Sequence, residues 1–204
     1  GAAPPGSAPP NPPNNQEIEG MSFSIALETQ HITQSLETIS RTGRAGAAAP
    51  DCGGVIGVTE EKKVEGVDIG VPVATIQKRT TLPFLSVGYF KNLLWLCGKT
   101  NNADWWAFKQ EEVLFTGCNG QSKSKSGSNV EFEITYEFKY IRNRSLVSID
   151  NGAILVPGKK GWHYLWVAYE KTVNANQLVP RPLAAYVEKV IQSEDFTFIG
   201  DIFV

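Results

Sequence analysis

Aromatic side chains are the strongest candidates for binding in this sequence. Trp105, Trp106 and Phe108 follow one another closely in the chain. Exposed aromatic rings can hold a sugar or a proline-rich segment, but such rings more often pack in a core or against another subunit. Adjacent residues of a strand point to opposite faces, so we expect at most one of the two tryptophans at the surface. The run therefore predicts packing first and a binding platform second.

Ionisable side chains show no catalytic pattern. His163 stands between two aromatic residues, and the closely spaced carboxylates are Glu65 with Asp68 and Glu111 with Glu112. Glycosidase chemistry needs two carboxylates about 5 to 10 Å apart in a cleft, and nothing in this spacing places them there. A structural histidine and solvated carboxylates are the favoured interpretations. We expect no catalytic residue.

A small basic cluster is the one feature that points toward nucleic acid. Lys123 and Lys125 precede the segment that ends near Arg142 and Arg144. The cluster lacks the signature of a nucleic-acid module, and the net charge of the chain is -2. Nucleic acid is therefore an unlikely partner.

No cofactor or metal motif is present. Cys52, Cys97 and Cys118 are widely spaced and form no C-x-x-C pair, which predicts free thiols rather than a disulfide framework or a metal site. Gly53 and Gly54 are not followed by the lysine of a phosphate-binding loop. We expect no cofactor and no metal.

The composition is that of a globular protein. Apolar residues make up 42% of the 204 residues and charged residues 20%, which allows an ordinary hydrophobic core. The longest apolar runs fall far short of the roughly 20 residues that a membrane-spanning helix needs. We therefore expect a soluble chain with no membrane partner.

The chain divides into an arm and a folded domain. Residues 1–20 contain six prolines and almost nothing apolar. Proline removes backbone donors and favours an extended chain, so this segment is predicted to be a flexible arm that either stays disordered or becomes ordered on a neighbouring subunit. Residues 21–204 are predicted to form a single β-rich domain.

A long β-hairpin is the clearest local prediction. Residues 130–140 alternate between apolar and mainly charged side chains, which is typical of a strand with one buried face and one face toward water. Residues 112–116 are its predicted partner strand. The Gly-, Ser- and Lys-rich segment 117–129 is predicted to be the loop between them.

Two further strands are predicted from their patterns. Phe23, Ile25 and Leu27 alternate with small residues, which predicts a first strand with one buried face. Residues 162–170 are apolar on both faces, which predicts a central strand. Shorter strands are predicted at 55–59, 67–73 and 154–156, a loop at 41–54, and a strand or helix at 183–191.

One helix is predicted over 86–97. Ser86 suits its N-cap and Gly98 its C-terminal stop. An apolar stripe at helical spacing is expected to face the core; it consists of Val87, Phe90, Leu93, Leu94 and Cys97. The whole pattern predicts a mainly β fold, a β-barrel or β-sandwich with one or two short helices, with α+β as the alternative.

The C-terminal residues are too apolar for a free tail. Phe196, Phe198, Ile199, Ile202 and Phe203 are expected to dock on the core or on another chain. Phe198 and Phe203 are therefore candidate interaction residues.

Four stretches carry a resemblance to other proteins. They are VEGVDIGVPV (64–73), LCGKTNNADWWAFKQEEVLFTGCNG (96–120), GWHYLWVAYE (161–170) and RPLAAYVEKVIQSEDF (181–196), together about a third of the chain. In these stretches the sequence resembles an uncharacterised group of small proteins encoded among phage and prophage genes. None of the stretches contains a catalytic signature, so no functional residue is carried over. The resemblance implies a structural role in a virion or its tail.

We therefore expect a virion structural or assembly protein, a capsid, tail or connector subunit, and not an enzyme. An arm, a long hairpin and an apolar C-terminus suit the exchange of segments with copies of the chain and with other virion proteins. The expected location is the virion, and the host cytoplasm before assembly. Two alternatives remain open: a carbohydrate- or surface-ligand-binding β module, and a hydrolase. The candidate interaction residues are Trp105, Trp106, Lys123, Lys125, Phe198 and Phe203.

Overall fold

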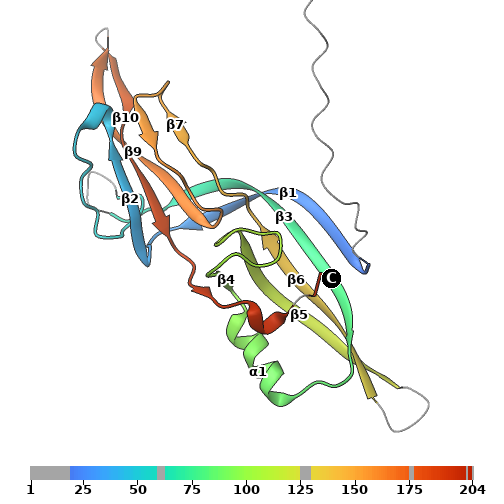
Figure 1. Ribbon diagram of the computed structural model, residues 1–204. Coiled ribbons are helices and arrows are strands. Elements are labelled where there is room, and N and C mark those ends of the chain that lie inside the picture. The colour runs from blue at the N-terminus through green and yellow to red at the C-terminus, as the bar shows by residue number, and fades with distance from the viewer. Residues whose placement is uncertain (1–18, 59–62, 125–129, 175–176, 201, 204) are drawn as a thin grey trace, which may run out of the picture.

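The computed structural model describes residues 19–58, 63–124, 130–174, 177–200, 202 and 203. Within them the fold is mainly β with one short α-helix, as the sequence predicts (Figure 1). Apart from Glu19 and Gly20, the arm predicted for residues 1–20 lies outside the described residues. In the described part of the chain, no helix is long and apolar enough to cross a membrane.

The larger sheet has six strands in the order β1-β3-β6-β5-β4-β11. Neighbours are antiparallel except β4 and β11, which are parallel. Within the described residues β1 and β11 are its two edges and do not meet, so the predicted β-barrel is wrong. The strands are β1 (Met21–Ile32), β3 (Val67–Leu82), β4 (Lys99–Asn101), β5 (Val113–Ser124), β6 (Val130–Tyr140) and β11 (Ser193–Glu194).

The predicted hairpin is the β5–β6 pair. β6 has the predicted bounds, and its alternation buries Ile134, Tyr136 and Phe138 on one face. On the charged face, Lys139 Nζ donates to the Glu28 carboxylate at 2.9 Å. β5 continues to Ser124, so the prediction of a loop from residue 117 onward was wrong for its first half. A bulge after Phe115 shifts the register by one residue, and the pairing then continues to Ser124 opposite Val130.

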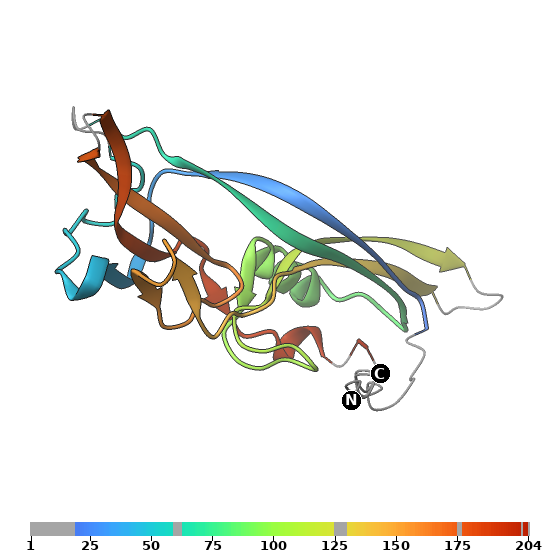
Figure 2. The same ribbon diagram turned by 90° about the horizontal axis from the view of Figure 1, so that it is seen from above.

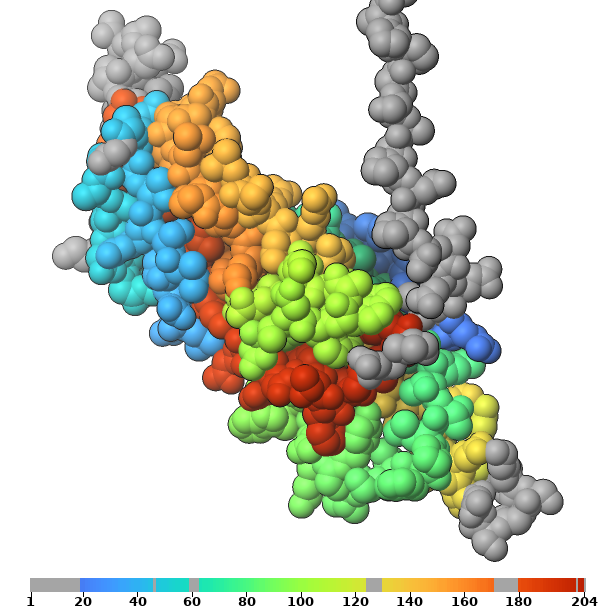
Figure 3. Space-filling view, in the orientation of Figure 1, coloured from blue at the N-terminus to red at the C-terminus, as the bar shows by residue number. Residues whose placement is uncertain are grey.

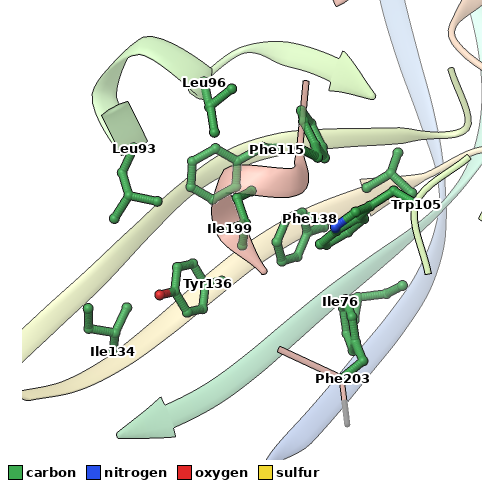
Figure 4. Close-up of a cluster of buried hydrophobic side chains, with 12 residues drawn as sticks. Ile76, Leu93, Leu96, Trp105, Phe115, Ile134, Tyr136, Phe138, Ile199 and Phe203 are labelled. Carbon is green, nitrogen blue, oxygen red and sulfur yellow. The ribbon is translucent and has the colours of Figure 1, made fainter. Parts of the chain in front are cut away.

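The main core lies on one face of the six-stranded sheet. Figure 4 shows Leu93 and Leu96 reaching from the helix α1 toward Phe115 and Tyr136 of the sheet. The C-terminal segment, with the short 3-10 helix η2 (Thr197–Ile199), covers another part of the same face. The buried residues of this core are Ile76, Leu93, Leu96, Trp105, Val113, Phe115, Ile134, Tyr136, Phe138, Phe196, Ile199 and Phe203. The C-terminal residues thus dock on the core, which confirms one of the two expected outcomes.

The helix α1 (Val87–Leu96) forms where predicted but turns a different side to the core. Ser86 caps it by accepting a hydrogen bond from the Tyr89 N–H at 3.0 Å. Its buried residues are Leu93 and Leu96, with Tyr89 packed partly against the core. The predicted stripe is wrong in most of its members, because the helix is apolar on more than one side and only one side finds a partner.

A second, three-stranded sheet has the order β2-β10-β9. Its strands are β2 (Glu37–Gly43), β9 (His163–Asn174) and β10 (Gln177–Lys189). β9 pairs only with β10 within the described residues, so the prediction of a central strand at 162–170 is wrong. The apolar pattern arises because Trp166 stacks on its cross-strand neighbour Tyr186 at 4.4 Å on one face, while Leu165 packs against the small β7–β8 sheet on the other.

Smaller elements complete this end of the molecule. The strands β7 (Val147–Ile149) and β8 (Ile154–Val156) form a two-stranded sheet, and β8 matches its predicted range. The strand β2 includes residues 41–43 of the predicted loop 41–54. A 3-10 helix, η1 (Arg44–Gly46), follows it. The strand predicted at 55–59 is reduced to isolated bridges within the described residues.

The two sheets give the molecule an elongated shape. Figure 2 shows β1 and β3 as a long arched ribbon that runs from the three-stranded sheet toward the β5–β6 hairpin. Near the middle, Val71 and Val73 of β3 pack with Ile141 and Trp162 in a separate buried cluster. This cluster joins the six-stranded sheet to the start of β9.

Candidate functional site

The first candidate surface is the outer strand of the six-stranded sheet. β1 pairs with β3 over its whole length without a register shift, and no strand of the described residues pairs with its other edge. Phe23, Ile25 and Leu27, here called the β1 stripe, are 69%, 71% and 75% exposed. The prediction that this strand has one buried apolar face is therefore wrong in the isolated chain.

The reason lies in what covers the sheet. Phe23 is the cross-strand partner of Ile76, and Ile76 is that of Phe138, so the β1 stripe lies on the core face of the sheet. The helix α1 and the C-terminal segment cover β5, β6 and part of β3, but the cover ends before β1. The β1 stripe is an uncovered continuation of the core face.

A second exposed apolar surface lies on α1. Val87, Phe90 and Leu94, here called the α1 stripe, recur at helical spacing and are 57% to 71% exposed. Beside them a hollow of about 480 Å³ is lined by apolar side chains that include Tyr89 and Phe198. Phe198 is partly exposed and packs on Tyr89 with ring centres 5.0 Å apart. Of the predicted interaction residues, Phe198 is placed on an open surface.

Of the other aromatic candidates, Trp105 and Phe203 are buried and Trp106 is 43% exposed. Trp105 is 6% exposed and lies among Phe138, Phe196 and Phe203, with ring centres 5.3 to 5.6 Å apart. Trp106 is partly exposed but stacks on Phe203 at 4.5 Å. Figure 3 shows the red C-terminal segment lying between the light-green residues after β4 and the green helix α1. Trp105 and Phe203 thus have little surface left for a ligand.

The basic residues are not brought together. Lys123 lies near the far end of the β5–β6 hairpin and pairs with Glu133. Lys125 lies outside the described residues. Arg142 and Arg144 follow β6 at its opposite end, about 30 Å away for a strand of this length, and they line an open groove beside β3. The cluster expected from the sequence is thus divided by the length of β6.

The Glu111 carboxylate joins several elements. It accepts a hydrogen bond from Lys189 Nζ at 2.6 Å, and it lies 3.4 Å from Lys160 Nζ and 3.2 Å from His163 Nε2. Burial alone would raise the pKa of Glu111, but the Lys189 hydrogen bond and the electrostatic interactions with His163, Lys189 and Lys160 lower the pKa overall. Burial also lowers the pKa of His163, although the Glu111 charge opposes that effect. We call these four residues the Glu111 cluster.

The neighbouring carboxylate has other partners. Glu112 accepts hydrogen bonds from the backbone N–H groups of Lys109 at 2.9 Å and Asn143 at 2.8 Å. Glu111 and Glu112 therefore hold the chain in place and share no cleft as an acid and a base would. Asp68 accepts a hydrogen bond from His31 at 2.7 Å on an exposed surface, and Glu65 is exposed.

The three cysteines are free thiols, as predicted: Cys97 and Cys118 are exposed and Cys52 is half-buried. In the ranges that the structure describes, no three His, Cys, Asp or Glu side chains gather as the ligands of a metal ion would. No protein-family model, curated protein or solved structure matches the chain. The geometry of its surfaces is therefore the ground for a functional proposal.

Sequence reasoning missed the exposure of both stripes. A signal for the β1 stripe was present, since residues 21–27 contain neither a charged residue nor a proline. Native edge strands usually carry such residues because they prevent pairing with another chain. The sequence does not reveal that this strand is an edge, so the signal acquires meaning only once the sheet order is known.

Proposed function

We propose that this chain is a structural subunit that assembles with copies of itself through protein–protein contacts, and that the assembly belongs to a virus particle. The observation that supports self-assembly is the unprotected edge strand β1 with its exposed apolar stripe. The partner is a second copy, whose own β1 edge pairs antiparallel with the first.

The backbone of β1 suits this pairing. The strand has 12 residues, and the register with β3 leaves the N–H and C=O groups of alternate residues directed away from the sheet. An edge of this length without charge or proline in its first half is a template for another strand. A second β1 satisfies the same groups in a self-complementary way, as a twofold interface requires.

The apolar stripe adds energy to the pairing. Burying a fully exposed Phe, Ile or Leu side chain contributes about 1.5 to 3 kcal/mol. Each side chain of the β1 stripe is about 70% exposed, so full burial of the stripe contributes at most roughly 3 to 6 kcal/mol per copy. Edge pairing sets the two stripes side by side on one face and supplies part of this energy. The α1 stripe is a further apolar surface through which larger assemblies grow.

The virus particle is the finer part of the proposal. It rests on the resemblance of residues 64–73, 96–120, 161–170 and 181–196 to the phage-encoded group. A subunit with an open sheet edge and apolar surface on two elements suits a shell, tail or connector, where each copy meets several neighbours.

Sedimentation velocity of the full chain over a range of concentrations tests the self-assembly. We expect a dimer or larger species for the wild type and a monomer for Phe23→Lys/Leu27→Lys, with unchanged circular dichroism. The matched control Leu36→Lys/Leu155→Lys adds the same charge at exposed leucines elsewhere and is expected to assemble like the wild type. A wild type that stays monomeric at millimolar concentration contradicts the proposal.

The particle assignment needs its own measurement. Mass spectrometry of purified particles produced by the genome that encodes the chain is expected to detect its peptides in a fixed ratio to the main shell protein. Particles that lack these peptides would remove the virion from the proposal and leave the self-assembly intact.

A further inference from the structure

An open groove lies between β3 and the segment that follows β6. Its volume is about 710 Å³, and the β1 stripe reaches it through Ile25. Residues 69–74 of β3 form one wall and residues 140–147 the other. Side chains alternate between the two faces of a strand, so a wall made of side chains alone would include only every second residue. Here consecutive residues line the groove, and the backbone of both walls therefore faces it.

The wall formed by β3 is a free strand edge. β6 pairs with β3 only from Ala74 onward, whereas β1 pairs with β3 from Val67. The Arg79 N–H donates to the Gly20 carbonyl on the β1 side of β3 at 2.8 Å. Backbone groups alternate in direction along a strand, so the odd-numbered residues of β3 face β1.

The even-numbered residues therefore face the groove. Gly70 directs both an N–H and a C=O toward it, and Pro72 directs a C=O only. Within the described residues no strand pairs with them on this side. Proline is confined to strand edges because it lacks the N–H that a ladder needs, and Pro72 fits this rule.

The opposite wall, residues 140–147, makes backbone hydrogen bonds to other segments of the chain. The Ile141 N–H donates to the Glu112 carbonyl at 3.0 Å, and Arg144 exchanges two backbone hydrogen bonds with Lys159 at 2.8 Å. The wall is thus fixed in position, and the side chains of Arg142, Arg144 and Leu146 are exposed and can contact a molecule in the groove.

The charge of the groove has one sign. Arg142, Arg144 and Lys159 line it, and no Asp or Glu does. The two arginines are exposed and form no ion pair within the described residues. Lys159 Nζ donates to the Gly161 carbonyl at 2.8 Å, and burial, followed by the Arg144 charge, lowers the pKa of Lys159 to about 8. The groove attracts an anionic occupant in a protein of net charge -2.

We propose that this groove accepts an extended acidic peptide segment of a partner protein by β-strand addition. The segment pairs with the free edge at Gly70 and Pro72, which supplies backbone hydrogen bonds. Its carboxylates contact Arg142 and Arg144, and its apolar side chains lie on Ile25, Ile69 and Leu146. This partner site shares Ile25 with the β1 stripe but pairs through the edge of β3 and not that of β1, and it goes beyond self-assembly.

Fluorescence anisotropy with defined probes tests this site in the full chain. The first probe is a labelled octapeptide of alternating Glu and Val, and the second replaces each Glu by Lys. Two further probes carry N-methyl groups on every Glu or on every Val of the acidic peptide. A 12-nucleotide oligothymidine is the nucleic-acid probe.

We expect the acidic peptide to bind and the Lys peptide not to bind. One of the two N-methylated peptides is expected to bind about tenfold or more weakly than the parent peptide, and the other is expected to bind like the parent. The reason is that the peptide strand pairs with β3 through only one of its two edges. Arg142→Gln/Arg144→Gln is expected to weaken binding about tenfold or more. The control Lys91→Gln/Lys123→Gln removes the same charge outside the groove and is expected to change binding less than about twofold.

Three results with the peptides would overturn the proposal. They are no binding of the acidic peptide at 1 mM, equal binding of both N-methylated peptides and the parent, and equal binding by wild type and the Arg142→Gln/Arg144→Gln variant. Oligothymidine that binds more tightly than the peptide and depends on the same arginines would overturn it in favour of nucleic acid. Sedimentation of the same samples reports self-association separately, so a failure of one proposal is distinguishable from a failure of the other.

Discussion

Replacing Glu111 tests whether the Glu111 cluster is a structural joint. The residue lies in the turn before β5, and its carboxylate contacts Lys160 and His163 at the start of β9 and Lys189 at the end of β10. Glu111→Ala removes the carboxylate that Lys160, His163 and Lys189 contact. We expect a folded but clearly less stable protein.

The magnitude follows from burial and backbone conformation. Removing one partner of a buried ion pair costs about 3 to 5 kcal/mol. Lys160 is partly exposed and can be hydrated again, so we expect a loss of about 3 kcal/mol, near the lower end of that range. Glu111 also has a φ of 61°, in the left-handed region that favours glycine. Glu111→Gly is therefore expected to recover about 1 kcal/mol relative to Glu111→Ala.

Urea denaturation at pH 7, followed by tryptophan fluorescence, measures these free energies. Glu65→Ala is the matched control, since that carboxylate is exposed, and it is expected to lie within about 0.5 kcal/mol of the wild type. A Glu111→Ala variant as stable as the control would refute the view that the cluster holds the two sheets together. A glycine variant no more stable than the alanine variant would refute the argument from φ.

Four further predictions follow from the packing and the pKa shifts. Trp105→Ala removes a buried ring from the main core and is expected to lower the unfolding free energy by about 3 to 5 kcal/mol in the same urea assay. Ser86→Ala removes the cap of α1 and is expected to cost about 1 kcal/mol, seen as a lower melting temperature without loss of β structure. A Cβ at Gly161 would lie 1.9 Å from the Ile141 carbonyl oxygen, so Gly161→Ala is expected to give little soluble protein on expression. Because burial lowers the pKa of His163 below its ordinary 6.5, the unfolded chain takes up that proton first; stability is expected to fall as pH drops through 6.5, and calorimetry of His163→Gln should show a smaller fall.

Local periodicity predicted most strands but not which residues they bury. Residues 130–140 form β6 with the predicted bounds because the apolar alternation there coincides with a covered face. Residues 21–27 have the same alternation, and the strand forms, yet its apolar side is open. Alternation states which side chains share a face, while the cover over that face comes from α1 and the C-terminus, more than 60 residues away in the chain.

The wrong predictions for α1 and for residues 162–170 have the same cause, because the packing partners are distant in the sequence. On α1 the apolar residues occupy two sides, and the side that packs is chosen by the position of the sheet. Residues 162–170 are apolar on both faces because one face meets β10 neighbours and the other meets β7–β8, not because strands flank β9 on both sides. Each of these partners is distant in sequence and leaves no local signal.

The sequence indicates some residues of the candidate surfaces but not how these residues are arranged. Phe198, a candidate interaction residue in the sequence, is 40% exposed, and Arg142 and Arg144, which are close in the sequence, line the same groove. The sequence does not show that Lys123 is separated from the two arginines by the length of β6. It also does not show that β3 extends beyond the end of β6, which leaves a groove. The groove depends on unequal strand lengths across a sheet, which pairing register alone determines.

The edge position of β1 has a consequence for how far an assembly grows. When two β1 strands meet, each satisfies the other, and neither copy retains that edge for a third. Pairing through β1 therefore stops at two subunits. A closed shell or an extended tube requires a different, unlike contact in addition, and the helix α1, well separated from β1 in Figure 1, offers apolar surface for it.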